Sequence, residues 1–215
     1  SLPTGMAALT GMANWQAETV VAAAGVDRVE RFARVPNDPM YGQQWQWART
    51  HAPEGWDINT GSPSVVVAVL DTGVDLDHPD LMSRIWMNTR EIAGNGVDDD
   101  SNGYVDDARG WDFADGDADP NPEVVAGDLG ATHGTHCAGL VGAATNNGTG
   151  VAGYDWSCRI MALRGGDSSG ILRSAAVEGI QYAADNGADV INMSFGGGPG
   201  SYSEVYDAAI SYAHD

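Results

Sequence analysis

The chain has 215 residues, a net charge of −20 at pH 7 and a hydrophobic fraction of 43%. That length suits one sizeable α/β domain or two small ones, and no apolar run approaches the roughly 20 residues that a membrane-spanning helix needs. All ten basic residues are arginines. Because phosphate binding relies on Lys and Arg, this acidic excess argues against nucleic acid as a partner, and we expect no membrane partner either.

The first 35 residues form a segment of their own. The apolar pattern in GVDRVERFARV (25–35) fits either a half-buried strand or one face of a short helix. PNDP at 36–39 then breaks the chain, and we place a boundary there between residues 1–35 and residues 36–215. No secretion signal is recognisable in this segment.

Three apolar segments predict the strands of a parallel sheet. SVVVAVLD (64–71) is a continuous β-branched run, typical of a strand buried on both faces, and RIMALR (159–164) and ADVINMSF (188–195) follow. Between the last two, residues 171–187 have apolar positions at helical spacing and end at Gly187, a C-terminal cap. Strand, helix and strand in this order indicate parallel pairing with right-handed crossovers.

The carboxyl ends of these strands are where we expect the working residues to gather. Asp71 ends the first strand, and Ser194 lies near the end of the third. His133 precedes a second predicted helix, residues 136–144. A carboxylate bonded to one ring nitrogen would fix the tautomer of that histidine and leave the other nitrogen to take a proton. The alternative is a metal site formed by His133 and His136.

Three long motifs carry a resemblance to a known family. VAVLDTGVDLDHPDL (67–81), HGTHCAGLVGAATNNGTGVAG (133–153) and DVINMSFGG (189–197) together resemble the subtilisin-like serine proteases, or subtilases, and most of all their thermitase-like branch. The resemblance covers roughly residues 36–215. It implies an α/β fold with a mostly parallel sheet and helices on both faces, of which the C-terminal third would be missing.

The resemblance also implies roles for residues of the triad region. Asp71 matches the triad aspartate, His133 the triad histidine, and His136 a packed helix residue without a catalytic role. Cys137 matches a free thiol beneath the active site of some members, which implies sensitivity to mercurials; we expect both Cys137 and Cys158 to be buried free thiols.

A substrate cleft follows from the same comparison, because the family binds an extended peptide as an added strand. One wall would be Ser168, Ser169 and Gly170, and the other Ser194, Phe195 and Gly196. Phe195 would shape a subsite for a substrate side chain, although plain core packing explains it equally well. The implied partners are protein or peptide substrates and the protein's own propeptide as an intramolecular inhibitor, of which residues 1–35 would be the remnant. The implied location is extracellular.

The sequence departs from the family at its end. It stops at Asp215, and no segment resembles either the GTSMA motif of the nucleophilic serine or the AAAGN-type segment of the oxyanion-hole asparagine. Without the serine, nearly all of the triad's rate gain is lost. We therefore expect the chain to be inert, as an N-terminal fragment or truncated gene product, and to fold poorly because a sheet edge and apolar surface stay uncovered.

Three functions of different classes remain open. The first is part of a secreted, calcium-stabilised serine endopeptidase, and the second a non-catalytic binding or scaffold protein that keeps the cleft. The third is a metallohydrolase that uses His133, His136 and a nearby Asp. HGTH lacks the glutamate of HExxH-type zinc helices, which counts against the third.

An acidic insert, residues 88–128, predicts calcium binding. Residues 91–128 hold twelve Asp and Glu against one base, Arg109. From residue 98 the spacing follows the opening of a calcium loop, in which alternate oxygens converge on the ion and a glycine permits the turn. The candidate ligands are Asp98, Asp100, Asn102, Tyr104 and Asp106, with Gly103 at the sixth place. The twelfth place is Arg109, so the loop is not an EF-hand and another residue, such as Asp107, would have to complete the shell. The alternative is a charged, solvated surface loop without a bound ion.

Two further calcium sites are implied by the resemblance. WDFADGDADP (111–120) resembles a calcium loop of the thermitase-like branch, with Asp112, Asp115 and Asp117 as ligands. The last site would combine the side chains of Asp38, Asp80 and Asn147 with the backbone carbonyls of Ala144, Thr149 and Val151. Taken singly, these residues also suit ordinary turns. Calcium here would stabilise the native state.

Overall fold

The computed structural model describes residues 34–123, 126–198 and 203–214. The chain divides into two units, residues 1–33 and 34–215, and every described element belongs to the second. The strand or helix predicted for residues 25–35 falls almost wholly outside the described residues.

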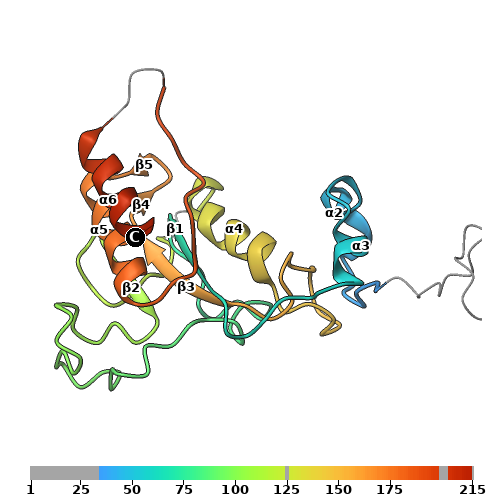
Figure 1. Cartoon of the computed structure of the whole chain (residues 1–215), viewed down its shortest axis with the longest axis horizontal. Coiled ribbons are helices and arrows are strands. Elements are labelled where there is room, and N and C mark those ends of the chain that lie inside the picture. The colour runs from blue at the N-terminus through green and yellow to red at the C-terminus, as the bar shows by residue number, and fades with distance from the viewer. Residues whose placement is uncertain (1–33, 124–125, 199–202, 215) are drawn as a thin grey trace, which may run out of the picture. The chain divides into compact units, whose positions relative to one another are not determined.

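A four-stranded parallel sheet with the strand order β2-β3-β1-β6 is the centre of this unit (Figure 1). The strands are β1 (Val66–Asp71), β2 (Gly110–Asp112), β3 (Arg159–Arg164) and β6 (Val190–Asn192). Parallel pairing is confirmed, although β6 is shorter than the predicted 188–195. Strand β2 lies inside the acidic insert and was not predicted, because its three residues carry no apolar run.

Three helices pack on the sheet. Helix α4 (His133–Gly142) begins three residues earlier than predicted, so that His133 is its first residue. Helix α5 (Arg173–Asp185) matches the predicted helix, and Gly187 beyond it has a φ of 78°, as its capping role requires. Helix α6 (Glu204–His214) was not predicted and packs on α5 (Figure 1).

Alternate side chains of β1 are buried on opposite faces of the sheet. Val67 and Val69 point to the face that α4 covers, and Ala68 and Leu70 point to the face that α5 and α6 cover. All four residues are at most 8% exposed. The continuous apolar run of β1 is explained by this burial on both faces, as predicted.

Shorter elements complete the described unit. Before the sheet lie η1 (Tyr41–Gln43), α2 (Trp45–Arg49) and α3 (Ala52–Trp56), which are held together by edge-on and tilted aromatic contacts. The short helix η2 (Gly130–Thr132) leads directly into α4.

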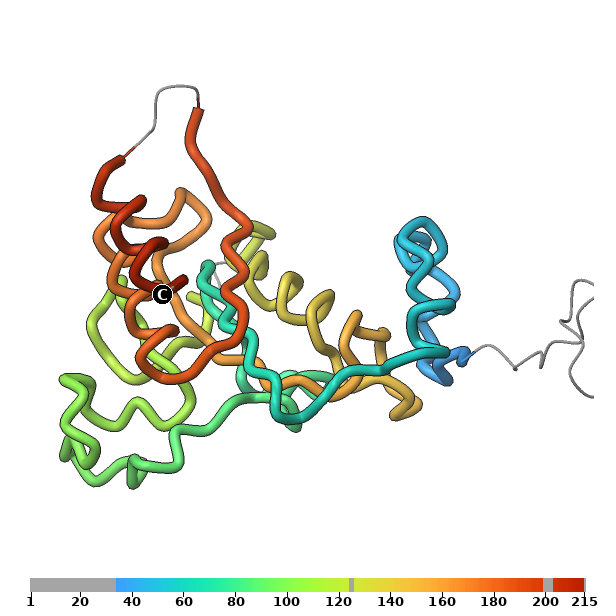
Figure 2. The backbone as a smooth tube through the Cα atoms, viewed as in Figure 1, coloured from blue at the N-terminus to red at the C-terminus, as the bar shows by residue number. Residues whose placement is uncertain are grey.

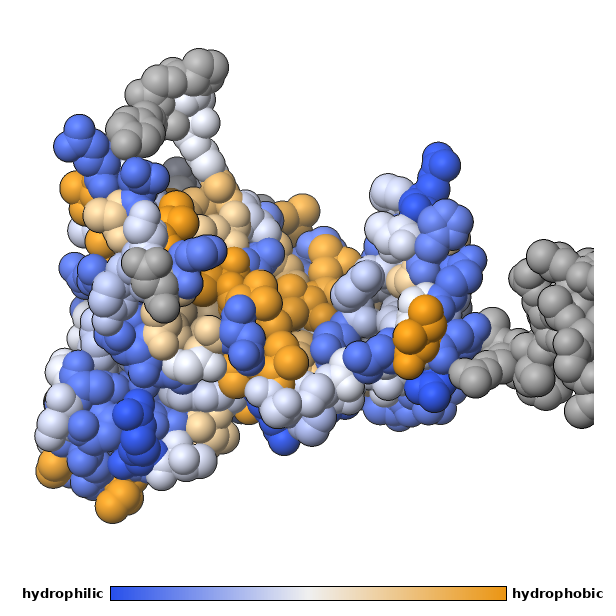
Figure 3. Space-filling model, in the orientation of Figure 1, coloured by the Kyte–Doolittle hydropathy of each residue, from blue (hydrophilic) through white to orange (hydrophobic). Residues whose placement is uncertain are grey.

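A two-stranded antiparallel hairpin follows β3 at once. It consists of β4 (Gly166–Asp167) and β5 (Gly170–Ile171), with Ser168 and Ser169 as its turn. The acidic insert, by contrast, runs as an irregular green trace in Figure 2 with little helix or strand. Its surface is mostly hydrophilic (Figure 3, lower left).

Candidate active site and cation sites

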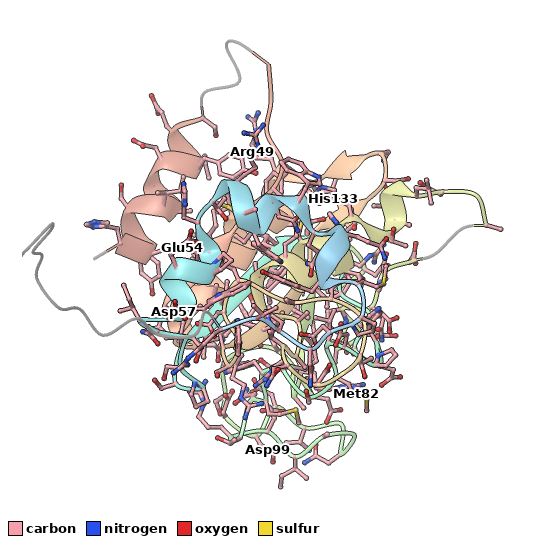
Figure 4. All side chains as sticks on the ribbon, turned by 90° about the vertical axis from the view of Figure 1, so that its right-hand side faces the viewer. Arg49, Glu54, Asp57, Met82, Asp99 and His133 are labelled. Carbon is pink, nitrogen blue, oxygen red and sulfur yellow. The ribbon has the colours of Figure 1, made fainter. Side chains whose placement is uncertain are left out.

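Asp71 and His133 meet at the carboxyl edge of the sheet. Asp71 is the last residue of β1 and His133, which is labelled in Figure 4, is the first of α4. The Asp71 Oδ1 atom lies 2.7 Å from His133 Nδ1. The carboxylate is buried, whereas 47% of the His133 side chain is exposed. A buried acid that orients a half-exposed imidazole is the arrangement of a general base.

Close backbone packing brings the two residues together. The Thr72 backbone N–H donates to Asp71 Oδ1 at 2.7 Å. The Thr72 hydroxyl accepts from the Gly134 N–H at 3.1 Å and donates to the Ala131 carbonyl at 3.2 Å. A Cβ on Gly134 would lie only 2.3 Å from the Gly73 carbonyl oxygen. Helix α4 reaches the end of β1 because this residue has no side chain.

Cys137 lies one turn along α4 from His133. Its Sγ atom is 3.9 Å from each ring nitrogen, and burial raises the pKa of the thiol. Cys158 is fully buried, and burial raises its pKa to about 12. Both cysteines are free and buried, as predicted.

The described residues do not place the two histidines of HGTH in one cluster of ligands. His133, Asp71 and Cys137 bring their ligand atoms within 4.8 Å of one another, and His136 is not part of that group or of any other such group in the described ranges. His136 lies on α4 but is exposed, so the prediction that it is a packed helix residue is wrong. The geometry thus gives the metallohydrolase hypothesis no support.

The two predicted cleft walls both border one hollow of about 670 Å³. Gly170, Phe195 and Gly196 line it together with the apolar side chains of Ile171 and Met193. Residues from α6 close its far side, and Arg173 stands on its wall at the start of α5.

The three serines of the predicted walls lie beside this hollow and do not line it. Ser168 packs against Gly130, whose added Cβ would lie 2.7 Å from the Ser168 Cβ, so the hairpin rests on the turn before His133. Ser169 donates its backbone N–H to Asp167 Oδ1 at 2.8 Å. Ser194 exchanges hydrogen bonds with the Asn192 side chain.

The predicted calcium site around Asp38 and Asp80 is assembled by the loop that follows α4. Both carboxylates are buried, with exposures of 4% and 1%. The Asn147 amide donates to Asp80 Oδ1 at 2.9 Å, and its backbone N–H lies 3.2 Å from Asp38 Oδ1. The Val151 N–H donates to Asp80 Oδ2 at 2.8 Å. The loop that carries the Ala144, Thr149 and Val151 carbonyls thus encloses two buried carboxylates, and this oxygen-rich donor set fits calcium.

The insert brings Asp98 and Asp100 together with a residue that the sequence did not single out, Glu91. Carboxylate oxygens of the three lie within 4.8 Å of one another. Glu91 is only 9% exposed, and its Oε1 accepts the N–H groups of Asp99 and Asp100 at 2.8 and 3.1 Å. Glu91 is the nearest counterpart of the carboxylate that the twelfth position lacks.

The other predicted ligands of this loop take different positions. The Asp106 carboxylate accepts the N–H groups of Asn95 and Gly96 at 3.0 and 2.9 Å and so caps a turn. The Asn102 side-chain oxygen accepts the Tyr104 N–H at 2.8 Å. Asp107 is fully buried and accepts hydrogen bonds from Asn88, Asn102 and Tyr182, so it is not one of the carboxylates that gather with Glu91.

The predicted site at Asp112, Asp115 and Asp117 does not fit calcium in this structure. The Arg164 guanidinium lies between the Asp112 and Asp115 carboxylates and bonds to both. Asp112 Oδ1 also accepts the Ala114 N–H at 2.7 Å. A buried arginine therefore supplies the positive charge that calcium would bring.

Neither Glu91 nor Arg164 was predicted as a site residue. Glu91 stands seven residues before the loop motif begins, outside the spacing that identifies such loops. Arg164 ends β3, far from the loop in sequence. A charged residue at the end of a buried strand, as at Asp71, is the signal that could have identified Arg164.

A family model described as the subtilase family matches residues 62–215, and the chain belongs to this family. It is 38% identical to thermitase of Thermoactinomyces vulgaris over 83% of this chain and 53% of that protein. A thermophilic serine proteinase of a Bacillus species is also 38% identical, over 84% of this chain and 38% of the relative. The chain thus spans about half the length of thermitase and a smaller share of the Bacillus proteinase.

Solved structures agree with the predicted fold. A protease from Pseudoalteromonas arctica superposes with a TM-score of 0.64 at 34% identity, over 84% of this chain and 56% of the other. The predicted family and α/β fold are both confirmed. No helix in the described ranges is long and apolar enough to cross a membrane.

Proposed function

We propose that Asp71 and His133 are the acid and the base of a serine endopeptidase triad. The observation that carries this proposal is the 2.7 Å contact between a buried carboxylate and a half-exposed imidazole at the end of the sheet. His133 Nδ1–H donates to Asp71, which fixes the tautomer and stabilises the imidazolium. The other ring nitrogen, Nε2, takes the proton of the serine as it attacks the peptide carbonyl and then gives it to the leaving amine.

The nucleophilic serine is not among the groups around this histidine. Within the described part of the chain, Asp71 and Cys137 are the side chains recorded at bonding distance from the His133 ring nitrogens. Ser194 bonds to Asn192, and its side chain also bonds to the Cys137 thiol rather than to the ring. We therefore propose that these 215 residues alone do not hydrolyse peptides.

The proposed substrate is an extended polypeptide that lies between residues 168–170 and 194–196. The hairpin β4–β5 offers backbone groups for strand addition, and the hollow beside it is walled by Ile171, Met193 and Phe195. Such a hollow favours an apolar substrate side chain. By the same resemblance, residues 1–35 are proposed as the remnant of an inhibitory propeptide and the protein as extracellular; a relative from Xanthomonas campestris is named extracellular protease.

Calcium is the proposed structural cofactor at two of the three predicted loops. Asp38, Asp80 and Asn147 would hold one ion with the carbonyls of the loop after α4. Glu91, Asp98 and Asp100 would hold another, with oxygens from the backbone of their own loop. Bound calcium would neutralise clustered carboxylates and stabilise the native state by mass action.

A fluorophosphonate probe tests the protease proposal, because it labels only an activated serine. If the coding sequence continues past codon 215 into a segment with the nucleophilic serine, that longer product should be labelled and should cleave casein, whereas residues 1–215 alone should do neither. In the full-length protein Asp71→Asn should lower kcat by about 10⁴ and His133→Ala by about 10⁶, the magnitudes seen in related triads. The control is His136→Ala, which should remain active.

The opposite results identify the rival functions. A full-length product that takes no probe and cleaves nothing, yet binds unfolded polypeptide, would be the non-catalytic scaffold. Stoichiometric zinc that is lost in both His133→Ala and His136→Ala would replace the triad with a metal site.

A further inference from the structure

A buried polar network lies beneath the acidic loop, behind the three carboxylates that are proposed to hold calcium. Its centre is Asp107, whose exposure is 0%. Asp107 Oδ1 accepts the Asn88 side-chain N–H at 2.8 Å. Asp107 Oδ2 accepts the Asn102 side-chain N–H at 2.9 Å and the Tyr182 hydroxyl at 2.6 Å. A carboxylate that is buried with three neutral donors is held in one orientation.

Both asparagines connect this centre to the candidate calcium ligands. The Asn88 side-chain nitrogen also lies 3.1 Å from Asp100 Oδ2. The Asn102 backbone N–H lies 3.1 Å from Asp98 Oδ1 and 3.1 Å from Asp100 Oδ1. Asp107 therefore holds the two asparagines in place, and the asparagines in turn donate hydrogen bonds to the Asp98 and Asp100 carboxylates.

Positive charge is scarce around these carboxylates. Arg90 approaches Asp100 Oδ2 at 3.1 Å, but 55% of its side chain is exposed. No other ion pair to Glu91, Asp98, Asp100 or Asp107 is recorded among the described residues. A cluster of carboxylate oxygens with so little positive charge beside it suits a divalent cation such as calcium.

Tyr182 brings helix α5 into the network. The residue is 2% exposed, and its ring packs edge-on against Tyr104 and Phe113 with centroids 5.0 and 5.7 Å away. Burial and the Asp107 carboxylate raise the pKa of the phenol, so it stays protonated and donates. Tyr182 lies in the C-terminal half of α5, while Arg173 at the other end borders the substrate hollow.

We propose that Asp107 and Tyr182 are positioning residues for the cation at Glu91, Asp98 and Asp100, and that they connect occupation of this loop to helix α5. The inference rests on the proposed calcium site of the same loop. Groups that orient metal ligands from behind commonly change metal affinity by one or two orders of magnitude when they are removed. Without the Tyr182 hydroxyl, Asp107 Oδ2 keeps only Asn102, and both asparagines gain freedom.

Calcium titration of the full-length protein and its Tyr182→Phe variant tests the proposal. The substitution keeps the ring contacts and removes one hydroxyl. We expect calcium affinity at this loop to fall about tenfold, with the Asp38–Asp80 site unchanged. Calcium should raise the Tm of Tyr182→Phe by less than it raises the Tm of the native protein. This decrease should be larger than the difference in Tm between the two proteins without calcium. Asp107→Asn, a second variant, should weaken the same site.

Tyr212→Phe is the matched control. It removes a hydroxyl that donates to Asp185 at 2.6 Å on the exposed side of α5 and α6, and it should leave calcium affinity unchanged. If Tyr182→Phe lowers Tm equally with and without calcium and leaves affinity intact, Tyr182 only supports packing and the inference is overturned. If Asp98→Asn with Asp100→Asn removes no calcium from the otherwise native protein, the proposed site itself falls.

Discussion

The two acidic loops of the insert compensate their charge in different ways. In the loop from residue 98 to 107, carboxylates face one another with a single, half-exposed arginine nearby. In the loop from residue 112 to 117, Arg164 fills the gap between Asp112 and Asp115. The loops have similar sequences but different neighbours. In the later loop Arg164 already supplies the positive charge, and we propose that the earlier loop takes calcium.

The difference arises from the sheet. Strand β2 pairs with β3 so that Asp112 lies beside Arg164, and the guanidinium of the neighbouring strand reaches the loop directly. Among the described strands none pairs with residues 98–107, and the groups beneath this earlier loop are neutral donors on Asn88 and Tyr182. Each of the following predictions tests this contrast.

The largest effect is expected from Arg164→Leu. The variant leaves the buried Asp112 carboxylate without its cation, and breaking a buried pair in this way costs about 3–5 kcal/mol. Urea unfolding of the full-length protein measures the loss. The control is Arg159→Leu on the same strand, because the Arg159 guanidinium donates to the Ser83 carbonyl and has no ion pair recorded among the described residues. Equal losses in the two variants would show that Arg164 is not the loop's counter-ion.

Glu91→Gln should remove the calcium of the earlier loop. At calcium concentrations 100 times Kd, loss of one site lowers the free energy of unfolding by about 2.7 kcal/mol. Isothermal titration should show one site fewer, and adding a chelator should lower the Tm of the variant less than that of the native protein. A full complement of calcium in Glu91→Gln contradicts the assignment.

Asp115→Asn should leave the number of bound calcium ions unchanged, because Arg164 already occupies the loop. The Asp115 side chain is 52% exposed, so we expect a stability loss of about 1 kcal/mol or less. Atomic emission on dialysed protein gives the stoichiometry. A missing ion in this variant would place calcium beside Arg164 after all.

The smallest effect concerns the exposed carboxylates beside the substrate hairpin. Hydrogen bonds from Ser168 and Ser169 lower the pKa of Asp128 and Asp167, respectively, below the usual 3.8. A lowered folded-state pKa means that these bonds stabilise the hairpin above that value and are lost as the pH falls through the folded pKa. The protection of the Ser169 amide, measured relative to its intrinsic exchange rate, should therefore fall only as the pH drops through the folded pKa of Asp167. Ser169→Ala removes one bond to this carboxylate and should move that loss of protection to higher pH.

Much of the fold followed from local pattern. The residues of β1 and β3 are apolar on both faces, and α5 has helical spacing with a glycine cap, so their bounds were predicted within a few residues. Helix α6 and strand β2 were missed because α6 is mostly exposed and β2 has only three residues. Both depend on neighbours in the fold more than on their own pattern.

The sequence by itself determined the family, the parallel sheet and the pairing of Asp71 with His133, because long motifs and strand ends are local features. Only the tertiary structure decided which carboxylates meet which cations. Glu91 reaches Asp98 and Asp100, Arg164 reaches Asp112, and Tyr182 reaches Asp107 through contacts between distant segments. Spacing along the chain identifies groups of acidic residues. Which positive group neutralises their charge depends on the distances and the burial that folding creates.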